Sequence, residues 1–328
     1  MKRTLGLTLL LFATLFSCMR QEKPLPAELS RAESVMWEHP DSALSILRSM
    51  PQSSLSSGKN YATWALLLAQ ARDKVYGKRL PDSLNIPSSD KLVQDAMDYF
   101  EKEGNLKRMA QTYYYKGQLL KDQKKITEAM PFFLKSKEMM TKLDEPLFTY
   151  LICQSLGNTY RYQDLYEESL VQLKDAYQYA LRSGNGERIS YALSELGRTY
   201  VHKNEMDSAL FYFGKSLDNA QRLGNIELEA MAMGELGVVY NKLSQGEKAL
   251  HYTRKELDLC LQISSLHKLP QVYYKIGSAF WSLGQLDSAK VYFQKSLETD
   301  NLYTLNEAYE VLYYICVEQK LYKEAIEY

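Results

Sequence analysis

One glycine position recurs along this chain at a fixed interval and constrains the fold more than any other feature. Five glycines stand 40 residues apart: Gly117, Gly157, Gly197, Gly237 and Gly277. Each lies inside a segment with helical spacing of apolar residues, where glycine costs about 1 kcal/mol relative to alanine. A glycine that returns at this cost marks a place where two helices pack too closely for a Cβ atom. Fixed periods of roughly 20 to 50 residues indicate a repeat architecture.

The residues at fixed distances after each glycine share their chemistry. Twelve positions later every residue is small: Ala129, Ser169, Ala209, Ala249 and Ala289. Sixteen positions later the residues are large, with the exception of a threonine: Phe133, Leu173, Phe213, Thr253 and Phe293. A small residue opposite the glycine lets a second helix lie on the first, and the large residue closes the contact. The sequence therefore predicts a helix, a short polar turn and a second helix in each repeat.

Other residues mark the expected helix ends. Glycines followed by asparagine are expected just past a helix C-terminus, at Gly104, Gly184 and Gly224. The segments Asp144-Glu145-Pro146 and Ser264-Ser265 occupy the corresponding place in other repeats. Aspartates followed by serine are expected to satisfy free backbone N–H groups at helix starts, at Asp41, Asp207 and Asp287.

This arrangement of glycine, small and large residues resembles the tetratricopeptide repeat (TPR), whose usual period is roughly 34 residues. The resemblance covers residues 105–328, as five full repeats and a truncated sixth. It implies an all-α fold, a right-handed α-solenoid of helical hairpins. Residues 27–104 are expected to form two atypical hairpins that begin the array. In the sixth repeat the chain stops inside the second helix, so Leu312 and Ile315 are expected to be mostly uncovered. We therefore expect the polypeptide to continue beyond Tyr328, or its end to be covered by a partner.

The N-terminus has the pattern of an export signal. A basic start precedes an apolar run, Leu5–Phe16, that is too short to span a bilayer. Residues 1–17 are predicted to be a signal peptide. Leu15-Phe16-Ser17-Cys18 resembles the bacterial lipobox, which implies a diacylated Cys18 and a lipidated tether over 18–26. The alternative is ordinary cleavage that leaves Cys18 as a free thiol. With lipidation, the expected location is the cell envelope, at the outer membrane or the periplasmic face of a membrane.

Composition and motifs argue against catalysis and nucleic-acid binding. Lys plus Arg equals Asp plus Glu, at 40 each, whereas a nucleic-acid binder would show a basic stripe. The four histidines do not pair with one another or with cysteine at a metal-ligand spacing, and no catalytic motif is present. We expect no enzyme activity, no cofactor and no metal. Cys153 and Cys316 occupy core positions and are expected to be buried free thiols.

The first helix of each TPR lines the concave groove, so its exposed stripe is the candidate ligand site. In repeats two and three the predicted binding residues are Gln154, Asn158, Arg161, Tyr162, Ser194, Arg198 and His202. Arg161 and Arg198 could each grip a carboxylate at two points, which predicts a protein or peptide partner of acidic character. The alternative is that both arginines pair with acids of adjacent helices. If they are free, changing both to alanine should shift the melting temperature by only about a degree or two.

The layout as a whole resembles the TPR lipoproteins and TPR sensor proteins of Bacteroidetes-type bacteria. That resemblance implies a membrane-anchored, envelope-facing scaffold that binds a protein or peptide in its concave groove. One alternative is the sensory half of a membrane signalling or transcription regulator whose output domain lies beyond residue 328. A second alternative is a glycan-uptake lipoprotein.

Overall fold

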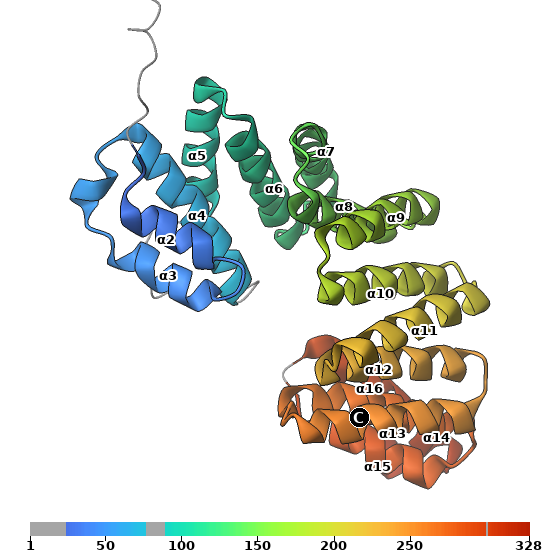
Figure 1. Cartoon of the computed structure of the whole chain (residues 1–328). Coiled ribbons are helices and arrows are strands. Elements are labelled where there is room, and N and C mark those ends of the chain that lie inside the picture. Colours follow the sequence, from blue (N-terminus) through green and yellow to red (C-terminus); the bar gives the residue numbers. More distant parts are fainter. Residues whose placement is uncertain (1–23, 77–88, 300) are drawn as a thin grey trace, which may run out of the picture. The chain divides into compact units, whose positions relative to one another are not determined.

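The computed structural model describes residues 24–76, 89–299 and 301–328. Within these ranges all regular structure is helical, with sixteen α-helices, two 3₁₀-helices and no strand (Figure 1). The predicted all-α class is therefore confirmed. The predicted signal peptide and Cys18 lie outside the described residues, as do residues 77–88. No helix in the described ranges is both long enough and apolar enough to cross a membrane.

The chain divides into two units between Asp122 and Gln123, and each is described by itself. In the first unit α2 packs on α3, and α4 packs on α5 and α6. Trp64 of α4 donates its indole N–H to the carbonyl oxygen of Leu47 in α3 at 2.9 Å, which joins the two pairs. The helices of this unit are α2 (Ala27–Val35), α3 (Pro40–Ser49), η1 (Gln52–Leu55), α4 (Gly58–Tyr76), α5 (Ser89–Glu103) and α6 (Leu106–Asp122).

The second unit is a series of helix pairs, each packed on the next. Its helices are α7 (Ile126–Lys142), α8 (Pro146–Arg161), α9 (Tyr166–Ser183), α10 (Gly186–His202), α11 (Met206–Leu223), α12 (Ile226–Lys242), α13 (Gly246–Gln262), η2 (Leu266–Lys268), α14 (Leu269–Ser282), α15 (Leu286–Ser296), α16 (Leu302–Glu318) and α17 (Tyr322–Ala325). The tightest pairs are α8–α9, α10–α11, α12–α13 and α14–α15. The regular 40-residue spacing of the repeats stays a prediction of the sequence.

The recurring glycines of these pairs are points of close approach between the two helices. A Cβ atom on Gly157 would lie 2.5 Å from Leu173, and one on Gly197 would lie 2.6 Å from the Phe213 ring. Gly237 has the same relation to Thr253, with 2.6 Å to the methyl carbon. Contacts under about 3 Å require the neighbour to move. The predicted reason is therefore confirmed for these three glycines, and the threonine fits the position of the large residues through its methyl group.

Turns between helices use the left-handed backbone region. Gly184 and Gly224 end α9 and α11 there, with φ of 67° and 62°, which confirms their predicted role. Non-glycine residues in this region also stand at helix ends, at Asp144, Asp164, Asn204, Ser244 and Ser264. Because a side chain destabilises this conformation by roughly 1–2 kcal/mol, these turns are places where the fold carries local strain.

The predicted caps at helix starts are wrong, and asparagines that were not predicted as caps take this role at α10 and α12. Asn185 and Asn225 accept the backbone N–H of Arg188 and Leu228, and so cap α10 and α12. The predicted aspartates do not cap. Asp207 lies inside the first turn of α11, which begins after Glu205 and has no side-chain cap, and Asp41 and Asp287 are placed in the same way. Their remaining contribution is a negative charge near the positive end of the helix dipole.

The final helix pair differs from the prediction. Leu312 and Ile315 are fully buried, because that face of α16 packs on the core of α14 and α15. The prediction that they would be uncovered is wrong. The face of α16 that stays exposed carries Tyr309, Tyr313 and Tyr314 instead. Cys153 and Cys316 are buried free thiols, as predicted.

Candidate functional site

The predicted site lies on the layer made by the first helices of successive pairs, α8, α10, α12 and α14, which we call the first-helix layer. Tyr162 is highly exposed, at 71%. His202 is exposed and stacks on Tyr166, with ring centroids 6.1 Å apart. Partial burial and the nearby charges of Arg161 and Lys242 lower the pKa of His202, which favours the neutral imidazole.

Ser194 does not face a ligand. It is fully buried, and its hydroxyl lies 3.0 Å from that of Ser216 on α11. The predicted stripe is displaced here because this position of α10 faces its partner helix. Gln154 and Asn158 of α8 are half-buried. The side-chain oxygen of Asn158 is buried and has no hydrogen-bond partner.

The two arginines are paired with acids of adjacent helices. Arg161 of α8 lies 2.8 Å from the carboxylate of Glu195 on α10. Arg198 binds the same Glu195 at 2.8 Å and reaches across to Glu235 of α12 at 2.6 Å. Burial disfavours the charged form of Arg198, but the two carboxylates outweigh it and raise its pKa. These contacts form a ladder of alternating charges, so the free positive patch expected from the sequence is absent at these two residues.

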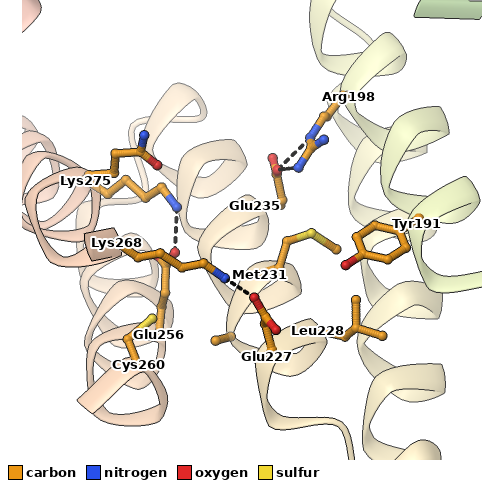
Figure 2. Close-up of a pocket in the computed structure, with 12 residues that line it drawn as sticks. Tyr191, Arg198, Glu227, Leu228, Met231, Glu235, Glu256, Cys260, Lys268 and Lys275 are labelled. Carbon is orange, nitrogen blue, oxygen red and sulfur yellow. Dashed lines mark hydrogen bonds and ion pairs between the residues drawn. The ribbon is translucent and has the colours of Figure 1, made fainter. Parts of the chain in front are cut away.

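A cavity of about 250 Å³ lies farther along the same layer (Figure 2). Side chains from α10, α12, α13, η2 and α14 line it. Of the seven predicted residues only Arg198 belongs to this lining. The lining residues are Tyr191, Arg198, Glu227, Leu228, Ala230, Met231, Glu235, Glu256, Cys260, Lys268, Gln271 and Lys275. A wider hollow lies between α9, α10 and α11, but no polar side-chain atom in its lining is buried without a hydrogen-bond partner.

Each cation in the cavity wall already has a carboxylate partner. Lys268 lies 2.6 Å from Glu227, and Lys275 lies 2.7 Å from Glu256. Arg198 holds Glu235 in the pairing described above. Figure 2 shows these three pairs around the space, with Met231 between them and Leu228 to one side, near Tyr191. The wall of the cavity therefore combines charged pairs with apolar side chains.

Glu256 is the unusual member of this set. It is only 6% exposed, and burial raises the pKa of its carboxyl group against the opposing effect of Lys275. Its Oε1 accepts from Lys275, but its Oε2 is buried with no hydrogen-bond partner. Gly234 of α12 makes room for it, since a Cβ there would lie 2.4 Å from Oε1.

Sequence reasoning missed Glu256, although a signal was present. In four other second helices the residue ten positions after the helix start is small and fully buried: Ser136, Ala176, Ser216 and Ser296. In α13 the same position is Glu256. Glu256 is therefore a charged residue at a position that is small and buried in these four helices. The described residues hold no group of three or more His, Cys, Asp or Glu side chains that could bind a metal ion.

Comparison with known proteins agrees with the repeat architecture. Residues 110–139 and 270–301 match the family model of the tetratricopeptide repeat, so the chain contains TPR repeats. This model describes a structural repeat and indicates no enzyme family. No curated protein matches the chain.

Solved structures share the fold at low sequence identity. The apo form of RapI has a TM-score of 0.72 at 15% identity, over 92% of this chain and 85% of that one. A Rap protein complexed with competence and sporulation factor has a TM-score of 0.62 at 13% identity, over 91% and 87%. A signal transduction ATPase with a tetratricopeptide repeat sensor, PH0952 from Pyrococcus horikoshii, has a TM-score of 0.68 at 14% identity. That match covers 89% of this chain but only 43% of the ATPase chain.

Proposed function

We propose that this protein is a TPR scaffold that binds a protein or peptide on the first-helix layer of its second unit. The observation that carries the proposal is the cavity at α10, α12, α13 and α14, which opens between a ladder of paired charges and contains a buried, unpartnered carboxylate oxygen. Its volume of about 250 Å³ is below the roughly 300–1,000 Å³ of sites for drug-sized ligands. It therefore suits one side chain of a larger ligand. The Rap protein structure with a bound factor supports a binding role for this fold.

The pairing of the two arginines removes the main argument for an acidic ligand. Arg161 and Arg198 are occupied by Glu195 and Glu235, so a ligand carboxylate would have to displace buried partners. Tyr162 and His202 remain exposed at the α8–α10 end of the layer and are the predicted residues still available to a ligand there.

The proposal includes a membrane anchor at Cys18 that holds the scaffold facing the cell envelope. Its support is the sequence alone, a short apolar run that ends in Ser17-Cys18. Two or more acyl chains are needed for stable anchoring. Mass spectrometry of the mature N-terminus should find a lipid-modified Cys18, and Cys18→Ser should leave the protein unprocessed or released. An unmodified cysteine, or a mature start elsewhere, would contradict the anchor without affecting the scaffold.

The binding role can be tested by panning the purified full chain against a displayed library of random 12-residue peptides. Enriched peptides are then measured by calorimetry against three variants. Tyr191→Ala with Met231→Ala removes two partly exposed side chains from the cavity wall, and we expect a loss of affinity of tenfold or more. Tyr162→Ala tests the α8–α10 end of the layer. Tyr313→Ala, an exposed tyrosine on α16, is the matched control and should change nothing. If no peptide is enriched, the proposed function is wrong.

The alternative of a sensory half is favoured by one observation, the similarity to the sensor-bearing ATPase, of which this chain spans 43%. It requires an output domain in the same polypeptide. Reading the gene past the codon for Tyr328 tests it, since an in-frame output domain is expected there and a stop codon would rule it out.

A further inference from the structure

The cavity has one unpartnered hydrogen-bond acceptor, and this acceptor identifies what the cavity binds. Among the described residues that line it, Glu256 Oε2 is the one polar side-chain atom buried without a hydrogen-bond partner. A buried polar group without a partner carries a desolvation cost that a native fold seldom keeps. Because an ionised carboxylate only accepts hydrogen bonds, the group that complements it is a donor.

The cations in the wall do not supply that donor. Lys275 is bound to the other oxygen of Glu256, Lys268 is bound to Glu227, and Arg198 lies between Glu195 and Glu235. The three cations of the wall are therefore engaged elsewhere and leave Oε2 without a donor, so a ligand can supply one. A ligand anion would meet only cations that already have partners.

The shape of the lining selects among cationic groups. Tyr191, Leu228, Ala230 and Met231 supply apolar surface beside the carboxylates. A lysine side chain combines an apolar stem with a charged tip, and it buries the stem where such surface exists. One unpartnered oxygen suits the compact ammonium of lysine, which acts as a point charge, better than the planar guanidinium of arginine, which binds best at two points.

We propose that this cavity is a lysine-binding pocket, in which the ammonium group of a lysine side chain in the bound peptide donates to Oε2 of Glu256 while its stem lies along Met231 and Tyr191. This inference rests on the proposed function, since it names the chemistry of the peptide that the scaffold binds. Gly234 is the positioning residue, because it leaves the space that Glu256 occupies.

The paired residues Gly234 and Glu256 support a purpose beyond packing. In the preceding hairpin the corresponding residues are Ser194 and Ser216, two small side chains that satisfy each other at 3.0 Å. The α12–α13 hairpin instead has a glycine and a buried acid, so one position has no side chain where the facing position holds a larger, charged one. Burial raises the pKa of Glu256, and an ammonium at Oε2 would oppose that rise.

The test uses the peptides enriched by panning, resynthesised with acetylated N-termini. Each lysine in turn is replaced by norleucine, which removes the ammonium and keeps the stem. For wild-type protein we expect one replacement to weaken binding at least tenfold. For Glu256→Gln the same replacement should have little effect, because the two changes remove the same contact and do not add.

Gly234→Ala gives a second measurement. Its Cβ would meet the end of the Glu256 side chain at 2.4 Å, so the carboxylate must shift while the helices stay packed. We expect the preference for lysine over norleucine to fall, with an unchanged circular dichroism spectrum. Gly214→Ala on α11, whose Cβ would meet nothing within 4 Å, is the matched control and should keep the full preference.

The two proposals fail in different ways. If peptides are enriched but no lysine replacement weakens binding, the lysine pocket is wrong and the scaffold function stands. The lysine pocket is also wrong if the effects of norleucine and Glu256→Gln simply add. If no peptide is enriched, both are overturned.

Discussion

The α10–α11 and α12–α13 hairpins are consecutive and built alike, yet they treat the same buried position in opposite ways. In α10–α11, Ser216 donates to the Ser190 carbonyl at 3.0 Å and lies 3.0 Å from the Ser194 hydroxyl, so this polar cluster is closed. In α12–α13, Glu256 keeps one oxygen unpartnered and a cavity opens beside it. The comparison teaches that two facing residues of one hairpin can differ, with a cavity beside them, while the packing that defines the fold is kept.

The buried acids of the two hairpins also differ in the number of cations that contact them. Glu195 of α10 is held between two arginines, whereas Glu256 of α13 has one lysine. Oε2 of both acids is buried without a hydrogen-bond partner. In Glu195 this oxygen lies 2.8 Å from Arg161, whereas the ion pair of Glu256 is made through its other oxygen, Oε1. The predictions below test this contrast, starting with the largest effect.

Removing both arginines should disrupt the ion-pair network around Glu195. Arg161→Ala with Arg198→Ala leaves Glu195, only 8% exposed, with neither of its cations. An uncompensated buried charge costs about 3–5 kcal/mol. We expect a loss of that size in the free energy of unfolding, measured by urea denaturation of the full chain at neutral pH. This corrects the expectation of a shift of only a degree or two, which assumed free arginines.

The matched control for that double change is Arg182→Ala with Arg222→Ala. Both side chains are exposed, and Arg182 contacts only the exposed Asp144 among the acids of the described residues. Such surface changes usually stay within about 0.5 kcal/mol each. Equal losses for the two double variants would show that the Glu195 network contributes nothing to stability.

Glycine-to-alanine changes should separate structural glycines from the one at the cavity. Gly197→Ala places a Cβ 2.6 Å from the Phe213 ring, and this overpacking is expected to cost about 1–3 kcal/mol. For Gly234→Ala the three nearest atoms all belong to the flexible end of Glu256, so this change should cost less. Gly214→Ala should gain up to about 1 kcal/mol from helix propensity. Melting temperatures of the three variants test this order. A Gly234→Ala loss as large as that of Gly197→Ala would mean that Gly234 is a packing residue.

The pH dependence of stability should reveal the buried carboxyl group. The pKa of Glu256 is raised in the folded state by burial, so the folded protein binds its proton more tightly than the unfolded chain does. Its contribution to stability is therefore fully present below the unfolded value of about 4.3 and is lost as pH rises through the raised folded pKa.

Glu256→Gln removes this titration. The free energy of unfolding of the variant, relative to wild type, should therefore rise as pH increases from about 4 toward neutrality. Denaturation midpoints at several pH values provide the measurement. A difference between the two proteins that does not change with pH would show that Glu256 has an ordinary pKa and is not desolvated.

The fold was predictable because its determinants lie close together in sequence. Gly157, Gly197, Gly237 and Gly277 each meet the residue sixteen positions later, so the same spacing in the sequence reports directly on one contact in each pair. The burial of Leu312 and Ile315 was missed for the opposite reason. The face of α16 that carries them packs on the core of α14 and α15, which lies earlier in the chain than the short helix considered in the prediction.

Sequence reasoning predicted the layer that carries the candidate site, but only one of the residues that line its cavity. The position of Arg198 on that layer followed from helical spacing, but its partners Glu195 and Glu235 depend on how successive helices stack. Glu256 was missed because it belongs to a second helix, whereas the predicted groove stripe runs along first helices. Its carboxylate reaches the first-helix layer only because Gly234 leaves a gap, and this relation between two helices appears in the structure alone.

The turns of the two hairpins give the smallest and most direct comparison. Asn204 joins α10 to α11 with φ of 62°, and Ser244 joins α12 to α13 with φ of 56°. Both side chains are exposed. Asparagine tolerates the left-handed region better than serine does, so Ser244→Gly should relieve more strain than Asn204→Gly. Because glycine also makes the unfolded chain more flexible, we expect a net gain on the order of 0.5 kcal/mol for Ser244→Gly and close to none for Asn204→Gly. Thermal melts of both variants measure this, and an equal gain would mean that the two turns are equally strained despite their different residues.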